Sequence, residues 1–243
     1  MSDRLAKYVE LADELAAAAD RFAEMAATVV GAAGRTLRFR ERLIIGLAFK
    51  TLSAFKALIE DARASRAEAM HHLKTMAEAW IYARAARDDA TDRTAELILA
   101  DALDDKVKLL QESGLDDVGL PEVARYRDAL RRDGRRMPTI RTIADRAKVG
   151  QWYSRVYRLA CEPAHLGDLV EFMPPAVGEL RPSGLTATYR AIVSLHHGVH
   201  VMLAMLDTVN DNELGLQLPT QNFRARLEVL RTGRSVGPRE ESP

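Results

Sequence analysis

Apolar residues recur at intervals of three and four along most of the chain, and this spacing restricts the fold more than any other feature. In residues 3–30 the residues that share it are Leu5, Val9, Ala12, Leu15, Ala16, Ala19, Phe22, Ala23 and Met25. An α-helix has about 3.6 residues per turn, so such residues form one stripe along its surface. No segment of useful length alternates apolar and polar residues as a β-strand does. The pattern therefore predicts an all-α protein.

The same spacing, interrupted by Gly, Pro and Asp, divides the chain into helical segments of unequal polarity. Helices are expected in residues 3–30, 40–60, 66–88, 93–112, 121–133, 140–148, 151–160, 185–208 and 219–230. We predict a single helical bundle of about seven to nine helices over residues 1–230. Residues 89–150 are more polar and are expected to form a helical insertion or flap, and residues 231–243 a disordered tail.

One helix start has a local signature. Ser65 is followed three residues later by Glu68. This is the spacing of a capping box, in which each side chain accepts a hydrogen bond from the backbone of the other residue. The sequence therefore predicts that a helix begins at Ser65, after a short break at residues 61–64.

Charge and cysteine content limit the classes of function. Lys and Arg together number 35, as do Asp and Glu, so no overall charge draws the chain to nucleic acid or to an acidic membrane. The single Cys161 excludes an intrachain disulfide and a site with several cysteine ligands, and fits a reducing compartment. We find no apolar run of membrane-spanning length and no signal peptide, and expect a cytoplasmic protein that does not enter a membrane.

Residues 151–165 contain an unusual concentration of aromatic and reactive side chains. Arg158 and His165 are seven positions apart, or about two helical turns. An arginine that holds phosphate and a histidine that moves a proton suffice for a metal-independent ribonuclease, which makes them candidate catalytic residues. Pro163 lies between them and interrupts the helix that would align them.

The apolar stripe of the helix expected in residues 66–88 contains one charged residue, Lys74, and Glu78 lies on its edge. Lys74 and Glu78 are four positions apart, so they share one side of the helix. A buried pair of this kind costs desolvation that its mutual attraction only just offsets, which favours a binding role over a stabilising one. The structural alternative is a lysine whose stem covers apolar surface while its ammonium group pairs with a nearby acid.

Two histidines lie in the apolar stripe of the helix expected in residues 185–208. His196 and His200 have the spacing that presents two imidazoles to one metal ion. A third and fourth ligand would have to come from His165, Glu78 or Asp207. The alternative is that both histidines are packed in the core and hydrogen-bonded there.

Two short blocks resemble motifs of a known family. In residues 72–80, Lys74 stands where the family has arginine, three intervening residues before a glutamate. In residues 157–165 a Tyr-Arg pair precedes a histidine, with Cys161 in the place of serine and an additional Pro163. On these motifs the chain resembles a family of mostly bacterial all-helical proteins known as a domain of unknown function.

This resemblance implies a helical bundle in which Lys74, Glu78, Tyr157 and His165 converge. We therefore take Lys74, Glu78 and Tyr157 as candidate binding residues. The spacing of Arg158 and His165 is also similar to that of the HEPN superfamily of helical ribonucleases and nucleotide-binding proteins.

Three hypotheses of function follow. In the first, the polar cluster binds a small ligand or a partner, or simply locks the bundle, and no cofactor is required. In the second, the protein is a HEPN-like endoribonuclease of a toxin or phage-defence system, with RNA as its substrate and a homodimer as its working form. In the third, it is a metal-dependent enzyme that uses His196 and His200. The sequence leaves open whether the protein is an enzyme.

Overall fold

The computed structural model describes residues 2–32, 37–66, 68–112, 120–131, 134, 136–161, 187–210 and 218–233. Within these ranges there is no strand, and the helices are α1 Asp3–Ala32, α2 Phe39–Arg63, α3 Ala69–Asp88, α4 Arg93–Glu112, α5 Leu120–Leu130, α6 Ile140–Arg146, α7 Gly150–Trp152, η1 Tyr153–Tyr157, α8 Arg158–Cys161, α10 Ala187–Val209 and α11 Gln221–Thr232. α7, the π-helical turn η1 and α8 follow one another without a break. Counted as one helix, they bring the described helices to nine. The prediction of an all-α bundle of seven to nine helices is confirmed.

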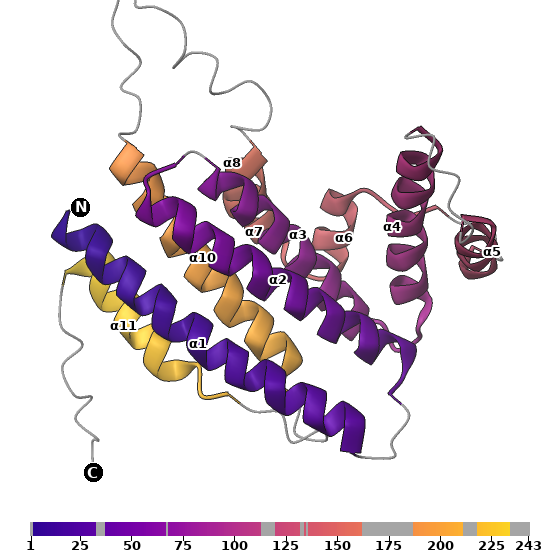
Figure 1. The fold of residues 1–243 in the computed structure, drawn as a ribbon, viewed down its shortest axis with the longest axis horizontal. Helices are drawn as coiled ribbons and strands as arrows, with labels where there is room; N and C mark the ends of the chain where they lie inside the picture. The colour runs from indigo at the N-terminus through magenta and orange to yellow at the C-terminus, as the bar shows by residue number, and fades with distance from the viewer. Residues whose placement is uncertain are drawn as a thin grey trace, which may run out of the picture.

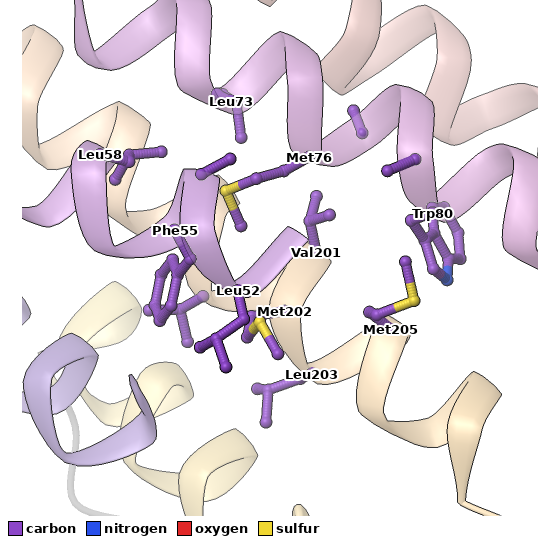
Figure 2. Packing of buried hydrophobic residues seen from close by; sticks show 14 of the residues in the cluster. Leu52, Phe55, Leu58, Leu73, Met76, Trp80, Val201, Met202, Leu203 and Met205 are labelled. Atoms are coloured by element: carbon purple, nitrogen blue, oxygen red, sulfur yellow. The ribbon is translucent and has the colours of Figure 1, made fainter. Parts of the chain in front are cut away.

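The centre of the bundle is formed by α2, α3 and α10, which all pack against one another. α1 packs against α2 and α10, and α11 returns alongside α1, so elements from the two ends of the chain lie side by side (Figure 1). The inward side of each central helix is apolar, as its spacing predicts. Figure 2 shows the result, with Phe55 and Leu58 of α2, Met76 of α3 and Met202 of α10 interdigitated in one core.

Aromatic and polar groups add specific contacts to this core. The indole nitrogen of Trp80 on α3 donates a hydrogen bond to the Thr208 hydroxyl on α10, at 3.2 Å. The same indole contacts Trp152 on α7 edge to face, with ring centroids 5.1 Å apart. Trp80 therefore joins α3 to both α10 and α7.

The more polar helices lie at one end of the bundle. α4 packs against α2, α3 and α5, and α6 packs against α3 (Figure 1). Arg127 of α5 and Arg131, the residue that follows α5, both form ion pairs with Asp104 of α4, the first at 3.3 Å. These are the helices of the expected insertion, and whether it moves as a flap stays a prediction. At the other end of the chain, α11 extends to Thr232, two residues into the expected tail, while residues 234–243 lie outside the described ranges.

The capping box expected at Ser65 is wrong. Ser65 has a left-handed backbone, with φ 55°, and α3 begins only at Ala69. The amide of Ser65 donates to the carbonyl of Ala62, and that of Arg66 to the carbonyl of Asp61. These bonds satisfy carbonyls at the end of α2, as in a helix C-terminal motif with one left-handed residue. Ser65 therefore ends the preceding helix instead of starting the next.

One described helix passes a test of length and composition for a membrane span, and the expectation that the protein does not enter a membrane stays a prediction. Residues Thr188–Val209 of α10 are long and apolar enough. In the bundle, 61% of the most apolar 18-residue stretch of this helix is buried. The core helix of a soluble protein meets the same criteria of length and composition. α10 is apolar because α1, α2, α3 and α11 surround it. The cytoplasmic location stays a prediction.

Candidate ligand site on helix α3

One side of α3 carries three polar side chains and ends at a carboxylate. Lys74, Glu78, Tyr82, Ala85 and Asp89 follow one another at intervals of three or four, so they lie on the same side of the helix and of the residue that caps its end. α6, η1 and α8 pack against α3. Glu78 and Tyr82 on this side lie near Tyr157 of η1, whereas Met76 and Trp80 face the core.

Near the middle of this side, Glu78, Tyr82 and Tyr157 form what we call the glutamate–tyrosine cluster. Burial raises the pKa of Tyr82, and the charge of Glu78 and a hydrogen bond to its side chain raise it further. Burial, followed by the Glu78 charge and Cys161, likewise raises the pKa of Tyr157. Tyr157 is also stacked on Tyr153, with ring centroids 5.3 Å apart and planes at 21°. Both phenols therefore stay protonated and surround a half-buried carboxylate.

The structure brings together only part of the predicted cluster. Glu78 and Tyr157 are neighbours, although they are separated by nearly eighty positions in the chain. Lys74 is half-buried on the same side of α3, but no ion pair joins it to Glu78 within the described residues. His165 lies outside those residues, so its predicted position in the cluster is not tested. Tyr82 was missed, although its position four residues after Glu78 was a usable signal.

Arg158, the candidate catalytic arginine, is exposed on the last turn of the helix formed by residues 150–161. Its backbone amide donates to the carbonyl of Tyr153, five residues back, which is the hydrogen bond of a π-helical turn. Because Arg158 is exposed, its guanidinium is accessible to solvent, as a phosphate-binding arginine must be. His165, the other half of the pair, lies outside the described residues.

An open pocket of about 200 Å³ lies one turn further along α3. It is lined by the end of α3, the start of α4 and the segment that carries α6, and its lining residues are Ala85, Asp88, Asp89, Thr94, Leu97, Met137, Pro138, Ile143, Arg146 and Ala147. Most of this lining is apolar, with charged groups at its edge. We call it the α3–α4–α6 pocket.

The glutamate–tyrosine cluster and the α3–α4–α6 pocket are neighbours. Ala85 of the pocket lies three residues after Tyr82, and Leu97 of the pocket lies four residues before Asp101 on α4. Asp101 is close enough to Tyr82 for its charge to raise the pKa of that phenol. Polar groups and an apolar hollow therefore occur together on one side of α3.

Asp89 closes the pocket and fixes the start of α4. Its carboxylate accepts hydrogen bonds from the backbone amides of Thr91 and Thr94, at 2.8 and 2.9 Å, and from both hydroxyls, at 2.8 and 2.5 Å. Burial raises the pKa of Asp89, but these hydrogen bonds outweigh that effect and lower it to about 2. Asp89 is therefore a permanently ionised helix cap whose acceptor sites are occupied.

His196, His197 and His200 form a separate histidine cluster on α10. The ring centroid of His196 lies 4.7 Å from that of His200 and 5.2 Å from that of His197. The Tyr8 hydroxyl is 3.3 Å from Nδ1 of His196, and Trp152 contacts His200 edge to face. Burial, and then the charge of a neighbouring imidazole, lowers the pKa of each histidine to about 4. All three rings are therefore neutral near pH 7.

The predicted metal pair His196 and His200 is brought together, but no further ligand joins it in the described part of the chain. There, no group of three or more His, Cys, Asp or Glu side chains is placed to hold a metal ion. Asp207 instead accepts a hydrogen bond from Thr220, and Glu78 lies with the tyrosines. His165, the remaining predicted ligand, lies outside the described residues. The hydrogen bond and ring contacts of His196 and His200 agree with the alternative, that they are packed in the core.

Comparison with known proteins found no relative of the chain. No protein-family model, no curated protein and no solved structure matches the chain. The resemblance of residues 72–80 and 157–165 to a helical family therefore stays a prediction, as does the similarity to the HEPN superfamily.

Proposed function

We propose that the protein is a helical binding protein that takes up a small ligand in the α3–α4–α6 pocket. The observation that carries this proposal is an open apolar hollow of about 200 Å³ with charged groups at its edge. Ligand sites in proteins are concave and mainly apolar, with a few polar groups that orient the ligand. The pocket has this composition, and the glutamate–tyrosine cluster adds polar groups next to it.

The position of the pocket also supports a binding role. Its walls come from three separate parts of the chain: Ala85 on α3, Leu97 on α4 and Ile143 on α6. Ile143 and Leu97 belong to the buried parts of their helices, so the walls are held in place by the packing of the bundle. Such a pocket is formed before the ligand arrives, which reduces the entropic cost of binding.

The proposal is tested by screening the full-length protein against small fragments with ligand-observed NMR, and by repeating the screen on a variant with a filled pocket. Ala85→Leu adds three carbon atoms to the pocket wall and keeps a residue that favours a helix. We expect it to weaken the binding of every pocket ligand by about tenfold. The matched control is Ala102→Leu, the same substitution at an exposed position of α4 outside the pocket.

Two results would contradict the proposal. The first is a screen in which no fragment binds the wild-type protein at millimolar concentration. The second is a set of ligands that bind Ala85→Leu and Ala102→Leu equally well, because their site would then lie elsewhere. Circular dichroism of both variants shows whether the helical fold is intact.

A metal-independent ribonuclease is a second candidate function, favoured by the exposure of Arg158. In this proposal Arg158 holds a phosphate of the RNA and His165 transfers the proton. We expect Arg158→Gln to abolish cleavage of RNA measured in the presence of a chelator, whereas Arg155→Gln, at a second exposed arginine of the same helix, retains it. Wild-type protein that leaves RNA intact would contradict this candidate.

A further inference from the structure

We propose that the ligand of the α3–α4–α6 pocket is a small carboxylate with an apolar body, and that Arg146 binds its carboxylate group. This inference rests on the proposed function, because it identifies the chemistry of a ligand for the same pocket. Three charged side chains line the pocket, which are Asp88, Asp89 and Arg146.

The two acidic residues of the pocket already have partners. The carboxylate of Asp88 is 3.2 Å from the guanidinium of Arg84, on the same helix. The carboxylate of Asp89 accepts four hydrogen bonds from Thr91 and Thr94. The Thr94 hydroxyl donates one of them, so it is also engaged. Both carboxylates therefore already have hydrogen-bonding partners, although Asp89 keeps its negative charge because its four donors are neutral groups.

Arg146 differs from these acids. It is exposed on the last turn of α6 at the edge of the pocket, and in the described part of the chain no carboxylate forms an ion pair with it. A guanidinium is planar and can donate two parallel hydrogen bonds to one carboxylate, which makes this pairing stronger and more directional than one with an ammonium group. Arg146 is therefore the charged side chain of the pocket lining that has no partner among the described residues, and the natural partner of its guanidinium is a carboxylate.

The rest of the pocket fits an apolar body of limited size. Its wall is formed by Ala85, Leu97, Met137, Pro138, Ile143 and Ala147. A water molecule occupies about 30 Å³ in the liquid, so the pocket of about 200 Å³ has room for roughly seven to ten non-hydrogen atoms. A short-chain fatty acid or a single-ring aromatic acid has this size. Such a ligand would place its chain or ring against the wall and its carboxylate at Arg146.

Three probes of nearly equal shape and different charge test this inference: benzoate is negatively charged, benzamide is neutral and benzamidine is positively charged. Each is titrated up to about 20 mM into the full-length ¹⁵N-labelled protein, and affinity is read from amide chemical shifts. We expect benzoate to bind in the millimolar range, at least about tenfold more tightly than benzamide, with benzamidine the weakest. Shifts should centre on the amides of residues 85–97 and 143–147.

Variants at Arg146 identify the group responsible. Arg146→Gln should weaken benzoate binding about tenfold, to the level of benzamide, and leave benzamide binding unchanged. Arg146→Lys keeps the charge without the planar group, and should give an intermediate affinity. Arg141→Gln, at an exposed arginine of α6 outside the pocket, is the matched control and should bind benzoate as the wild type does. All variants are checked for an unchanged thermal midpoint.

The outcomes separate this inference from the proposed function. Equal binding of the three probes at the pocket, or tighter binding of benzamidine, would overturn the carboxylate inference and leave the small-ligand function standing. Tight binding of benzoate that is unchanged in Arg146→Gln would overturn the role of Arg146. Absence of all three from the pocket in this experiment would overturn the inference, while the fragment screen and the Ala85→Leu variant decide the proposed function separately.

Discussion

The histidine cluster predicts how the stability of the protein depends on pH. His196, His197 and His200 have a pKa of about 4 in the folded protein, against an ordinary value of 6.5. As the pH falls below 6.5, the unfolded chain therefore binds protons that the folded protein does not. The stability contributed by the neutral rings is complete above pH 6.5 and is lost progressively as the pH falls towards 4.

The size of this effect follows from the pKa shifts. The folded pKa of about 4 lies about 2.5 below the ordinary value of 6.5, and a difference of one in pKa corresponds to about 1.4 kcal/mol, so each histidine contributes at most about 3–4 kcal/mol. The rings are only partly buried, and solvent reduces this to about 1–2 kcal/mol each. Since each ring also responds to the charge of its neighbours, the three values do not simply add. We expect a total loss of about 3–5 kcal/mol, a large part of the 5–15 kcal/mol typical of a folded domain.

The assay is urea unfolding followed by circular dichroism, at intervals of half a pH unit from pH 8 to pH 5. The free energy of unfolding should be level from pH 8 to about pH 7 and should then fall steeply. This window separates the histidines from an acid such as Asp89, whose pKa is about 2 and whose contribution is lost only below its ordinary value of 3.8. Acid unfolding should therefore begin well above the range in which such carboxylates become protonated.

Two variants give the control. Replacing His196, His197 and His200 together by Gln removes the titrating groups, and should flatten the curve between pH 7 and pH 5. Val199→Ala, at a fully buried position of the same helix, should lower stability by about 1–3 kcal/mol at every pH without changing the slope. A wild-type stability that is level down to pH 5, or a triple variant whose stability falls as steeply as that of the wild type, would contradict this prediction.

Two further predictions concern helix geometry. A Cβ at Gly198 would lie 3.1 Å from Cδ1 of the fully buried Leu58, so Gly198→Ala should lower the free energy of unfolding by about 1–2 kcal/mol. A Cβ at Gly46 would meet nothing within 4 Å, so Gly46→Ala should raise the free energy of unfolding by about 0.5–1 kcal/mol. Both variants are measured by urea unfolding. Asp89→Ala should cost about 1–2 kcal/mol because it removes the cap of α4, while Asp88→Ala, which removes one exposed ion pair, should cost less than about 1 kcal/mol in the same assay.

The helices could be predicted from the sequence because each one must bury an apolar stripe. The helix expected in residues 185–208 is observed at Ala187–Val209, and the one expected after residue 92 is observed at Arg93–Glu112. Their apolar residues are the ones that pack in the core, so the spacing and the structure have the same cause. Local signals were less reliable. At Ser65 the sequence fits both a helix start and a helix end, and only the packing of α2 and α3 decides between them.

The candidate site could be predicted only where its residues share a helix or a recognised motif. The proximity of Glu78 and Tyr157 was expected from the resemblance, and the structure brings them together. The α3–α4–α6 pocket was missed because its walls, such as Ala85, Leu97 and Arg146, come from helices distant in the chain. No local spacing relates such residues, since their proximity depends on how the polar helices pack at the end of the bundle.

The π-helical turn explains how one short helix reaches two different parts of α3. Trp152 contacts Trp80, and Tyr157 faces Glu78. In a regular α-helix two residues five positions apart are separated by about 1.4 turns and point in different directions. The amide of Arg158 instead bonds to the carbonyl of Tyr153, and this wider turn brings residues five positions apart close to one full turn. Trp152 and Tyr157 then point to the same side of the helix, so both face α3, the first against Trp80 and the second against Glu78.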